Sequence, residues 1–534
     1  MIKFTRALNL AAVLILSGLA DEGFAAPSDP NLQIRSFVES LEAGNKPLVA
    51  GRELIAPQLI ERIYQTRNHA PIWLSGGPLE NEWPGMLDAI DESVNHGFSP
   101  ERYHRTAIEQ LSLASDGTAL LAFELLLTDA FLGQALHRTV GAVNPQTLDP
   151  EWQLPHTEVD VVAILDQVVD EKRPAKAALN ELWPVDEEYG RLLQWRAEVF
   201  ASGEVTMVQV PPGPLLKPGH EGERIVLLKE RLMGAGEHTA VYNENLRQEV
   251  MAFQQSSGLE PDGIVGDHTL EMLNATRGSW IDRLDANLER WRWLPRETPD
   301  AYIRVNIAAF VLRAMENGRA ALSMDVIVGQ PYRRTPVFTE TIKYLVLNPF
   351  WNVPFSIATR DKLPLLKSDP APLALNGYEV RTDGSESFVT VDQINWTEVT
   401  PRSFRYLLRQ RPGAANALGR IKFMLPNPYA VYLHDTPNRE LFSRQERAFS
   451  SGCIRLEQPL KLAQWLLSRE GNPYAKQIDN MLDSFETRTI YLAQPMPAYI
   501  VYFTAFSMED GAVTFRRDIY GRDRLIIDAL REQK

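Results

Sequence analysis

The chain has 534 residues, 44% of them apolar and 23% charged, with a formal net charge of −14. One hydrophobic core does not organise a chain of this length, so we expect about three or four globular domains. The negative charge argues against a general nucleic-acid-binding protein, which needs a basic face for phosphates.

The N-terminal segment, residues 1–25, has the pattern of a secretory signal peptide. Lys3 and Arg6 precede an apolar run over 7–20, and the small residues Gly23 and Ala25 suit cleavage after Ala25. The run is shorter than the about 20 residues of a membrane span, so an uncleaved membrane anchor is the alternative. We expect no later segment to cross a membrane.

Residues 26–215 are predicted to form a helical scaffold domain. Residues 119–136 are almost continuously apolar, which indicates a central buried helix, and 160–169 and 187–200 are shorter helical candidates. The histidines of this region lack metal-ligand spacing, and we expect no chemistry there. The prolines and glycines of 209–222 indicate a linker.

Residues 216–277 are predicted to form a smaller unit. Helical runs at 225–232 and 249–255 are followed by two turns within 258–266 and a helix from 269 to 273. The series Phe253-Gln254, Gly258-Leu259 and Asp262-Gly-Ile-Val-Gly266 resembles the three-helix peptidoglycan-binding module, the alternative being a small helical spacer. Residues 278–300 then form a predicted linking helix that packs on the scaffold.

Residues 301–495 change to short strands. We expect them at 302–307, 310–315, 320–328, 341–347, 419–426 and 430–433, with a hairpin turn at 316–318. The pattern indicates a mostly β catalytic domain, and the whole chain is therefore predicted to be an α+β multidomain protein.

A polar stretch over 361–417 interrupts the strands and includes a predicted helix at 401–410. We interpret this stretch as an insertion that caps a site, because lids exclude water and hold substrate; the alternative is an insertion without function. Residues 496–534 are expected to form late strands and a tail.

Cys453 is the only cysteine of the chain. Exported proteins usually pair their cysteines, so an unpaired one is either a buried apolar filler or a reactive thiol. The preceding Ser450-Ser451-Gly452 suits an exposed turn and favours the reactive thiol. A helix predicted over 457–469 follows, and the partial positive charge of its start would favour a thiolate.

His434 is the only histidine of the predicted β domain, so it is the candidate base for Cys453. Strand alternation directs the carboxylate of Asp435 away from the ring, but its backbone carbonyl could orient the imidazole. The N–H groups of Gly452 and Cys453 are natural donors to an oxyanion. The alternative is a structural His434 and an inert Cys453.

The run from His434 to Pro437 followed by Ser450-Ser-Gly-Cys-Ile-Arg455 resembles the signature of the YkuD-type L,D-transpeptidase catalytic domain, over about residues 300–495. The segments 328–329, 335–336 and 348–354 also fit that family. The order of domains is similar to the large Gram-negative L,D-transpeptidases. Ser451 stands where many members carry a histidine, and the large periplasmic subgroup shares this serine.

The resemblance implies an acyl transfer in peptidoglycan, with export to the periplasm. Cys453 would attack the carbonyl between diaminopimelate and the terminal D-Ala of a tetrapeptide stem, and D-Ala would leave. The side-chain amine of a second diaminopimelate would then resolve the thioester into a 3→3 cross-link. His434 would act as general acid and base, oriented by the Asp435 carbonyl.

The resemblance also assigns supporting residues and partners. Gly452, Cys453 and the Tyr432 hydroxyl would hold the oxyanion. Substrate contacts or scaffold roles are implied for Trp351, Asn348, Ser451 and Arg455. No metal or organic cofactor is implied, and the expected partners are stem tetrapeptides as donor and acceptor, cell-wall synthesis proteins, and carbapenem inhibitors.

Two other functions stay open on the residues alone. A carboxypeptidase or endopeptidase of the same fold would use the same nucleophile and base, with water in place of the amine. A non-catalytic cell-wall-binding protein is the third hypothesis, although an intact Cys453 and His434 argue against it.

Overall fold

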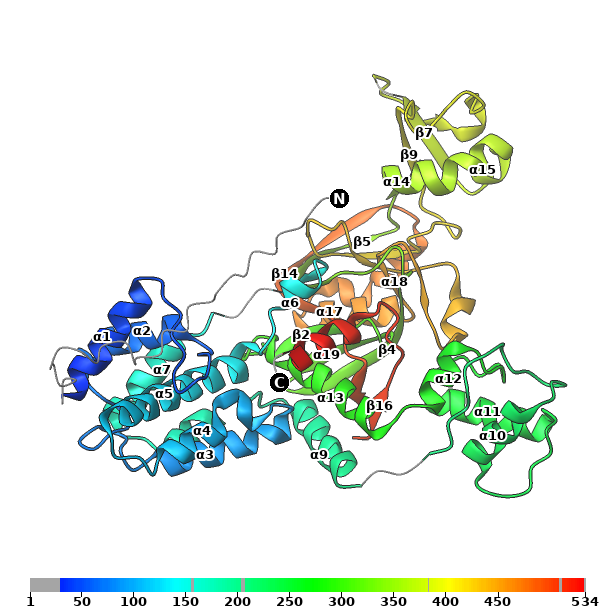
Figure 1. The fold of residues 1–534 in the computed structure, drawn as a ribbon. Helices are drawn as coiled ribbons and strands as arrows, with labels where there is room; N and C mark the ends of the chain where they lie inside the picture. Colours follow the sequence, from blue (N-terminus) through cyan, green and yellow to red (C-terminus); the bar gives the residue numbers. More distant parts are fainter. Residues whose placement is uncertain (1–28, 155–157, 203–206, 383, 509–510, 533–534) are drawn as a thin grey trace, which may run out of the picture.

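The computed structural model describes residues 29–154, 158–202, 207–382, 384–508 and 511–532, so the predicted signal peptide lies outside the described residues. Figure 1 shows a helical N-terminal part, a central β-rich body and two smaller units attached to that body. The predicted α+β multidomain architecture is confirmed.

The scaffold is built around helix α5 (Gly117–Val140), which is buried along most of its length because its residues are apolar on every side. Contrary to our expectation, α5 is long and apolar enough to cross a membrane, but 78% of its most apolar window is buried inside the protein. The helices that pack on it are α1 (Pro30–Glu42), α2 (Pro57–Thr66), α3 (Trp83–Glu92), α4 (Arg105–Leu111), α7 (Val161–Glu171) and α8 (Ala175–Asn180). The short helix α6 (Pro145–Leu148) and helix α9 (Glu187–Ala201) complete the region.

The small unit contains α10 (Glu223–Met233), α11 (Glu244–Ser256) and α12 (Asp267–Leu273), the three helices that the sequence predicts. Buried Gln254 fixes the turns between the last two helices. Its amide donates to Asp262 Oδ1 and to the Ile264 carbonyl, both at 2.9 Å, and its oxygen accepts the Gly263 N–H at 2.9 Å. One side chain thus satisfies several polar groups that burial would otherwise leave unpaired.

The linking helix α13 (Arg277–Arg292) connects the scaffold to the catalytic domain. Its Asp285 forms a buried ion pair with Arg196 of α9 at 2.5 Å, and its Arg290 pairs with Asp523 at 2.6 Å. Asp523 belongs to α19 (Arg522–Glu532), so the predicted tail is a helix packed into the body.

The catalytic sheet has the strand order β1-β5-β10-β11-β13-β4-β3-β2-β14, and β14 also pairs with β5, so the sheet closes around an apolar core. The predicted boundary at 495/496 is wrong, because it cuts through β14. The strands are β2 (Ala301–Asn306), β3 (Val311–Glu316), β4 (Arg319–Gly329), β5 (Val337–Leu347), β10 (Ile421–Met424), β11 (Leu433–His434), β12 (Ala448–Ser450), which pairs β4, β13 (Ile454–Leu456) and β14 (Arg488–Val501).

Strand β1 (Trp152–Gln153) comes from the scaffold region and was not predicted. It pairs in parallel with β5, Trp152 opposite Val337 and Gln153 opposite Phe338. The N-terminal scaffold therefore contributes an edge strand to the catalytic sheet. Helices α17 (Pro459–Arg469) and α18 (Ile478–Asp483) pack against the same body, and β15 (Ala505–Ser507) and β16 (Val513–Phe515) form a separate hairpin.

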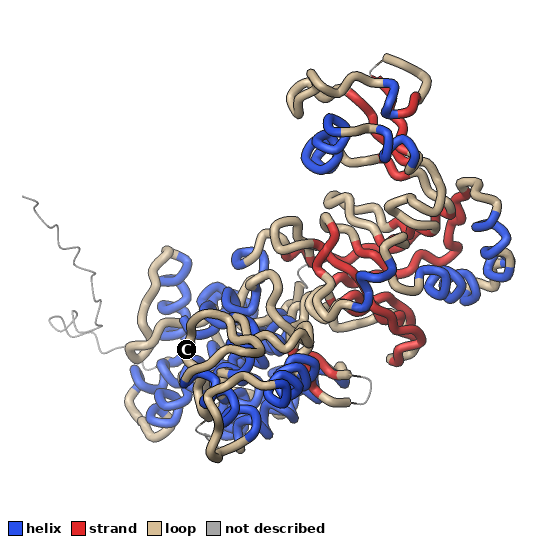
Figure 2. Tube along the Cα trace, turned by 90° about the vertical axis from the view of Figure 1, so that its right-hand side faces the viewer, coloured by secondary structure: helices blue, strands red, loops and turns tan. Residues whose placement is uncertain are grey.

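The insertion forms its own small unit, which we call the cap, over residues 351–418. Its sheet has the order β6-β9-β7-β8, with β6 (Trp351–Asn352), β9 (Tyr406–Gln410), β7 (Tyr378–Thr382) and β8 (Val389–Thr390). Figures 1 and 2 show the cap standing out from the central body. The cap helices are α14 (Phe355–Ile357), α15 (Leu363–Ser368) and α16 (Ala371–Leu375).

Two predictions about the cap are wrong. Residues 406–410 form strand β9 instead of the end of a helix, because they hydrogen-bond between β6 and β7 and tertiary pairing overrides local helical periodicity. The unit also starts before 361, because Trp351 pairs with Gln410 and packs in the cap core.

Candidate active site

Two neighbouring strands bring Cys453 to His434. Strands β11 and β13 run in parallel, with Leu433 opposite Ile454 and His434 opposite Arg455. The Ile454 N–H donates to the Tyr432 carbonyl at 3.1 Å. Cys453 directly precedes β13 and therefore lies beside the strand that ends in His434.

The turn before the cysteine depends on Gly452, whose φ of +114° is unfavourable for residues with a side chain. Thr335 braces this turn: its hydroxyl donates to the Gly452 carbonyl at 2.8 Å and accepts the Gly329 N–H at 2.9 Å. Tyr520, from the C-terminal segment, donates to the Gly329 carbonyl at 2.6 Å and accepts the Thr335 N–H at 3.1 Å. The nucleophile thus stands on a rigid turn.

The sulfur of Cys453 is held between backbone and side-chain groups. Its thiol lies 3.8 Å from the Ala430 carbonyl, and the hydroxyl and backbone N–H of Tyr432 both hydrogen-bond the sulfur. Burial raises the pKa of Cys453 above its usual range, while the Tyr432 hydrogen bonds and the cations Lys422 and Arg455 pull it down. The resting group is therefore a protonated thiol with thiolate-stabilising groups in place.

The prediction that a helix start lowers the thiol pKa is wrong. Strand β13 follows Cys453, and α17 begins only at Pro459. Because the helix dipole acts within about one turn of the helix end, it does not reach the sulfur. The charges of Lys422 and Arg455 lower the pKa of the thiol instead, and Lys422 comes from β10, a strand that sequence position alone does not place near the cysteine.

His434 is buried, and its Nδ1 lies 2.5 Å from the Asp435 carbonyl oxygen. Burial, and next the charge of Arg455, lower the pKa of His434 to about 3. The imidazole is therefore neutral at pH 7 and able to accept a proton. No hydrogen bond joins the ring to Sγ between these two described residues, so the resting pair is a neutral thiol beside a neutral base.

The Asp435 carboxylate points away from the ring and holds the strand ends. It accepts the backbone N–H groups of Arg420 and Thr436, each at 2.7 Å, and pairs with the Arg439 guanidinium. This bracing of the residue that orients the imidazole was not visible in the sequence.

The predicted oxyanion donors differ in whether each already makes a hydrogen bond within the site. The Gly452 N–H donates to Ser450 Oγ at 3.1 Å, and that hydroxyl donates to the Cys453 carbonyl at 2.5 Å. Gly452 is thus already engaged within the turn. The Cys453 N–H donates to none of the described residues and is available to an oxyanion, whereas the Tyr432 hydroxyl is engaged with the sulfur.

Trp351 and Arg455 lie near the sulfur. The Trp351 indole hydrogen-bonds the Tyr432 hydroxyl, which links the cap core to the cysteine. Lys422 Nζ lies 3.8 Å from the centroid of the Tyr432 ring. Within the described part of the chain, the Arg455 guanidinium forms no hydrogen bond or ion pair, and its charge lowers the pKa of the Cys453 thiol.

Asn348 and Ser451 have structural partners. Asn348 is buried with a φ of +46°, and its amide donates to the Met481 and Leu482 carbonyls at 3.3 and 3.0 Å. These hydrogen bonds fit the alternative scaffold role of Asn348, because its amide holds the loop. Ser451 is exposed, and its hydroxyl accepts a hydrogen bond from Arg333 at 2.9 Å.

An open pocket of about 690 Å³ lies against Cys453. Sequence reasoning missed one of its walls, which comes from Pro150 and Glu151 immediately before β1. Arg334 and Tyr429 line the pocket further, together with the turn that holds the cysteine. No local pattern marks residues 150–151 as part of a site.

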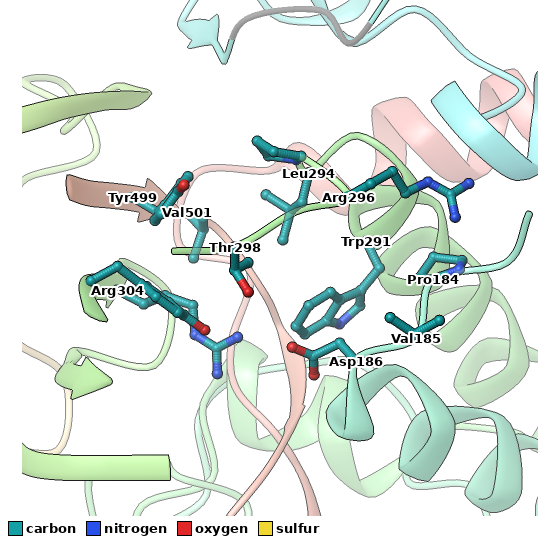
Figure 3. A pocket seen from close by; sticks show the side chains of 12 residues that line it. Pro184, Val185, Asp186, Trp291, Leu294, Arg296, Thr298, Arg304, Tyr499 and Val501 are labelled. Atoms are coloured by element: carbon teal, nitrogen blue, oxygen red, sulfur yellow. The ribbon is translucent and has the colours of Figure 1, made fainter. Parts of the chain in front are cut away.

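A second pocket, of about 660 Å³, lies at the seam between scaffold and sheet and contains none of the predicted site residues (Figure 3). Trp291 and Asp186 face it from the helical side, and Arg304 and Tyr499 from the strands. Burial raises the pKa of Asp186, and Arg304 is already paired with Glu188 at 2.5 Å.

Three segments of the chain match models of known families. Residues 300–478 match YkuD, described as the L,D-transpeptidase catalytic domain. Residues 58–195 match the scaffold domain, and residues 221–273 match the family described as "Putative peptidoglycan binding domain".

A protein of Haemophilus influenzae named "Putative L,D-transpeptidase" is 36% identical over 244 residues, which is 46% of this chain and 48% of that protein. The chain thus matches about half the length of this curated relative. Among solved structures, an L,D-transpeptidase from Xylanimonas cellulosilytica is 14% identical, covers 54% of this chain and 99% of its own, and has a TM-score of 0.17. The Ldtfm–avibactam carbamoyl enzyme is 13% identical, covers 39% and 51%, and has a TM-score of 0.17.

Proposed function

We propose that this chain, which carries a YkuD-type L,D-transpeptidase catalytic domain beside a scaffold domain and a peptidoglycan-binding domain, cross-links peptidoglycan in the periplasm through a cysteine thioester. The observation that carries the proposal is the thiol of Cys453, which lies in that domain on a braced turn beside a neutral, oriented His434. A thiol with an adjacent base is the requirement for acyl transfer by a cysteine.

In the first half-reaction Cys453 attacks the carbonyl that joins diaminopimelate to the terminal D-Ala of a donor stem. His434 accepts the thiol proton and delivers it to the departing amine, as the new S–C bond replaces the C–N bond. The Cys453 N–H and the Tyr432 hydroxyl face the oxyanion. Lys422 and Arg455 stabilise negative charge on the sulfur before attack.

In the second half-reaction the side-chain amine of a second diaminopimelate attacks the thioester. The N–C bond forms, the S–C bond breaks, and the proton lost by the amine returns through His434 to the sulfur. The product is a 3→3 cross-link. With water in place of the amine, the same acyl-enzyme would give only a shortened stem.

Muropeptide analysis of tetrapeptide-rich sacculi after incubation with the purified protein tests the proposal. Dimers with 3→3 links are expected. Shortened monomers alone would make the protein a hydrolase of the same fold, and unchanged sacculi would overturn the enzymatic proposal.

Intact mass spectrometry tests the nucleophile separately. From the family resemblance we expect a carbapenem to add its mass to the protein, and Cys453→Ala to abolish that addition. Persistent acylation of the variant would contradict the role of Cys453.

A further inference from the structure

The pocket beside Cys453 has a wall that the N-terminal scaffold fixes in place. The Val337 N–H donates to the Glu151 carbonyl at 3.0 Å, which extends the pairing of β1 with β5 by one residue. Glu151 is therefore held at the pocket by backbone pairing with the catalytic sheet.

Arg334 stands opposite, on the loop that runs against the catalytic turn. Its Nε donates to the Pro331 carbonyl at 3.1 Å, and its guanidinium lies 5.6 Å from the Tyr520 ring centroid. Its Nη1 is 3.7 Å from Glu151 Oε2, and the side chain is 36% exposed. No other partner among the described residues engages it, so N–H groups of an oriented guanidinium remain for a ligand.

Glu151 is itself held from behind. Buried Arg522 donates to Glu151 Oε2 at 3.0 Å and to Asp149 Oδ2 at 2.5 Å. Because Arg522 already compensates Glu151, the charge of Arg334 is not cancelled by that carboxylate. Glu151 therefore orients the Arg334 guanidinium and leaves its other N–H groups accessible to a ligand.

The other cations near the cysteine are differently placed. Lys422 and Arg455 do not line this pocket and act on the sulfur, while Arg333 is paired with Asp361. Among the described residues that line the pocket, Arg334 is the only cation.

The chemistry of the reaction calls for a cation beside the thioester. The D-Ala that leaves and the acceptor diaminopimelate that enters each carry an amine and a carboxylate on one carbon of D configuration. Both amines bond to the same carbonyl carbon, so both units occupy the same side of it. A guanidinium matches the geometry of a carboxylate through two parallel hydrogen bonds.

We propose that Arg334, positioned by Glu151 of the scaffold, binds the α-carboxylate of the D-amino-acid unit that leaves and of the one that enters. This inference rests on the proposed transpeptidase function. It makes Arg334 a specificity-determining residue for acceptors that carry a free α-carboxylate, and Glu151 its positioning residue.

The test offers the purified full chain an unlabelled tetrapeptide with isotope-labelled D-alanine and labelled D-alaninamide together, and measures both products by mass. The two acceptors compete for one acyl-enzyme, so the ratio of their initial rates of product formation does not depend on how fast that acyl-enzyme forms. Arg334→Ala is expected to lower the D-alanine to D-alaninamide ratio by about 10- to 100-fold, the range of a hydrogen-bonded contact to a charged group. Arg334→Lys should retain part of the preference.

Glu151→Gln is expected to lower the ratio less, through a higher KM for D-alanine with an unchanged KM for D-alaninamide. Arg319→Ala, which removes an exposed arginine at the far end of β4, is the matched control and should leave the ratio unchanged. An unchanged ratio in Arg334→Ala, in a protein that still exchanges D-alanine, would overturn this inference and leave the proposed function intact. Absence of any exchange by the wild type would overturn the proposed function, and this inference with it.

Discussion

Arg333 and Arg334 are neighbours in sequence, yet they connect the catalytic turn to opposite parts of the molecule. Arg333 donates to both oxygens of Asp361 in the cap, at 2.6 and 2.8 Å, and to Ser451 Oγ. Arg334 reaches the scaffold, where its Nη1 lies 3.7 Å from Glu151. Arg333 thus makes a two-point ion pair with Asp361, whereas the Arg334 guanidinium keeps N–H groups that can bind a ligand in the pocket beside the thiol.

The two sides of Cys453 differ in the same way. On the cap side, Trp351 contacts Tyr432, which contacts the sulfur, so this side sets the state of the nucleophile. On the scaffold side, Glu151 and Arg334 face an open pocket, where we propose that they act on the unit that reacts with the thioester. The cap side thus controls the ionisation of the Cys453 thiol, and the scaffold side is proposed to select the acceptor.

His434→Gln should slow acylation and acyl transfer alike. Loss of the general base is expected to lower acylation and transfer together by about 10²- to 10⁴-fold, because both proposed half-reactions move a proton through this ring. Stopped-flow measurement of acylation, with product analysis of transfer, checks it. A variant slowed in only one half-reaction would contradict the shared base.

Arg455→Met should affect the thiol side. Removing this cation raises the pKa of the Cys453 thiol further and also raises the pKa of His434 from about 3. Acylation at pH 7 should slow by up to about tenfold, the effect of losing about 1.4 kcal/mol of thiolate stabilisation. The rate at which a carbapenem adds its mass, measured from pH 6 to 10, should increase with pH. In the variant this increase should be shifted to higher pH than in the wild type. Arg455→Lys should keep the wild-type profile, and an unshifted Arg455→Met profile would exclude this role.

Arg333→Gln should loosen the cap while leaving acceptor choice unchanged. The pair it breaks has side chains 24% and 37% exposed, so an effect of up to about fivefold is expected on acylation. Hydrogen exchange over residues 355–368 should accelerate, while the D-alanine to D-alaninamide ratio stays constant. A changed ratio would mean that the two arginines do not act separately.

The smallest expected effect is the pH dependence of the stabilisation of the cap by the Arg333–Asp361 ion pair. The Arg333 guanidinium holds the pKa of Asp361 below its usual range. A carboxyl group lowered in this way stabilises the fold fully above its unfolded pKa of about 3.9, and that stabilisation is lost as the pH falls through the folded value. Hydrogen exchange of the cap, corrected for intrinsic rates, should therefore be equal at pH 5 and pH 8. A difference between these two values would point to another titrating group.

The sequence predicted the features that depend on local spacing. The apolar run around α5, the hairpin at 316–318 and the strand that ends in His434 each carry their signal within a few residues. Cys453 could be identified as a nucleophile candidate from its uniqueness and its small polar neighbours. The match to a known catalytic domain confirmed the resemblance on which its role was based.

The remaining features depend on distant pairing. Strand β1 is only Trp152 and Gln153, too short for any periodicity, and its partner lies far along the chain. The same holds for Lys422, which approaches the sulfur only because β10 lies against β11. Residues 406–410 look helical alone and become a strand between two others. The electrostatics of the site therefore could not be derived before the sheet was known.

The pairing of Asp149 with Arg522 also orders events in time, because the two residues are 373 positions apart. A chain emerges N-terminal first during synthesis, and contacts of high sequence separation form late because a long loop must close. The wall of the pocket beside Cys453 therefore gains its final support only after the α19 segment has been made. A chain whose α19 segment has not yet formed can therefore fold its scaffold and still lack the final support of this pocket wall.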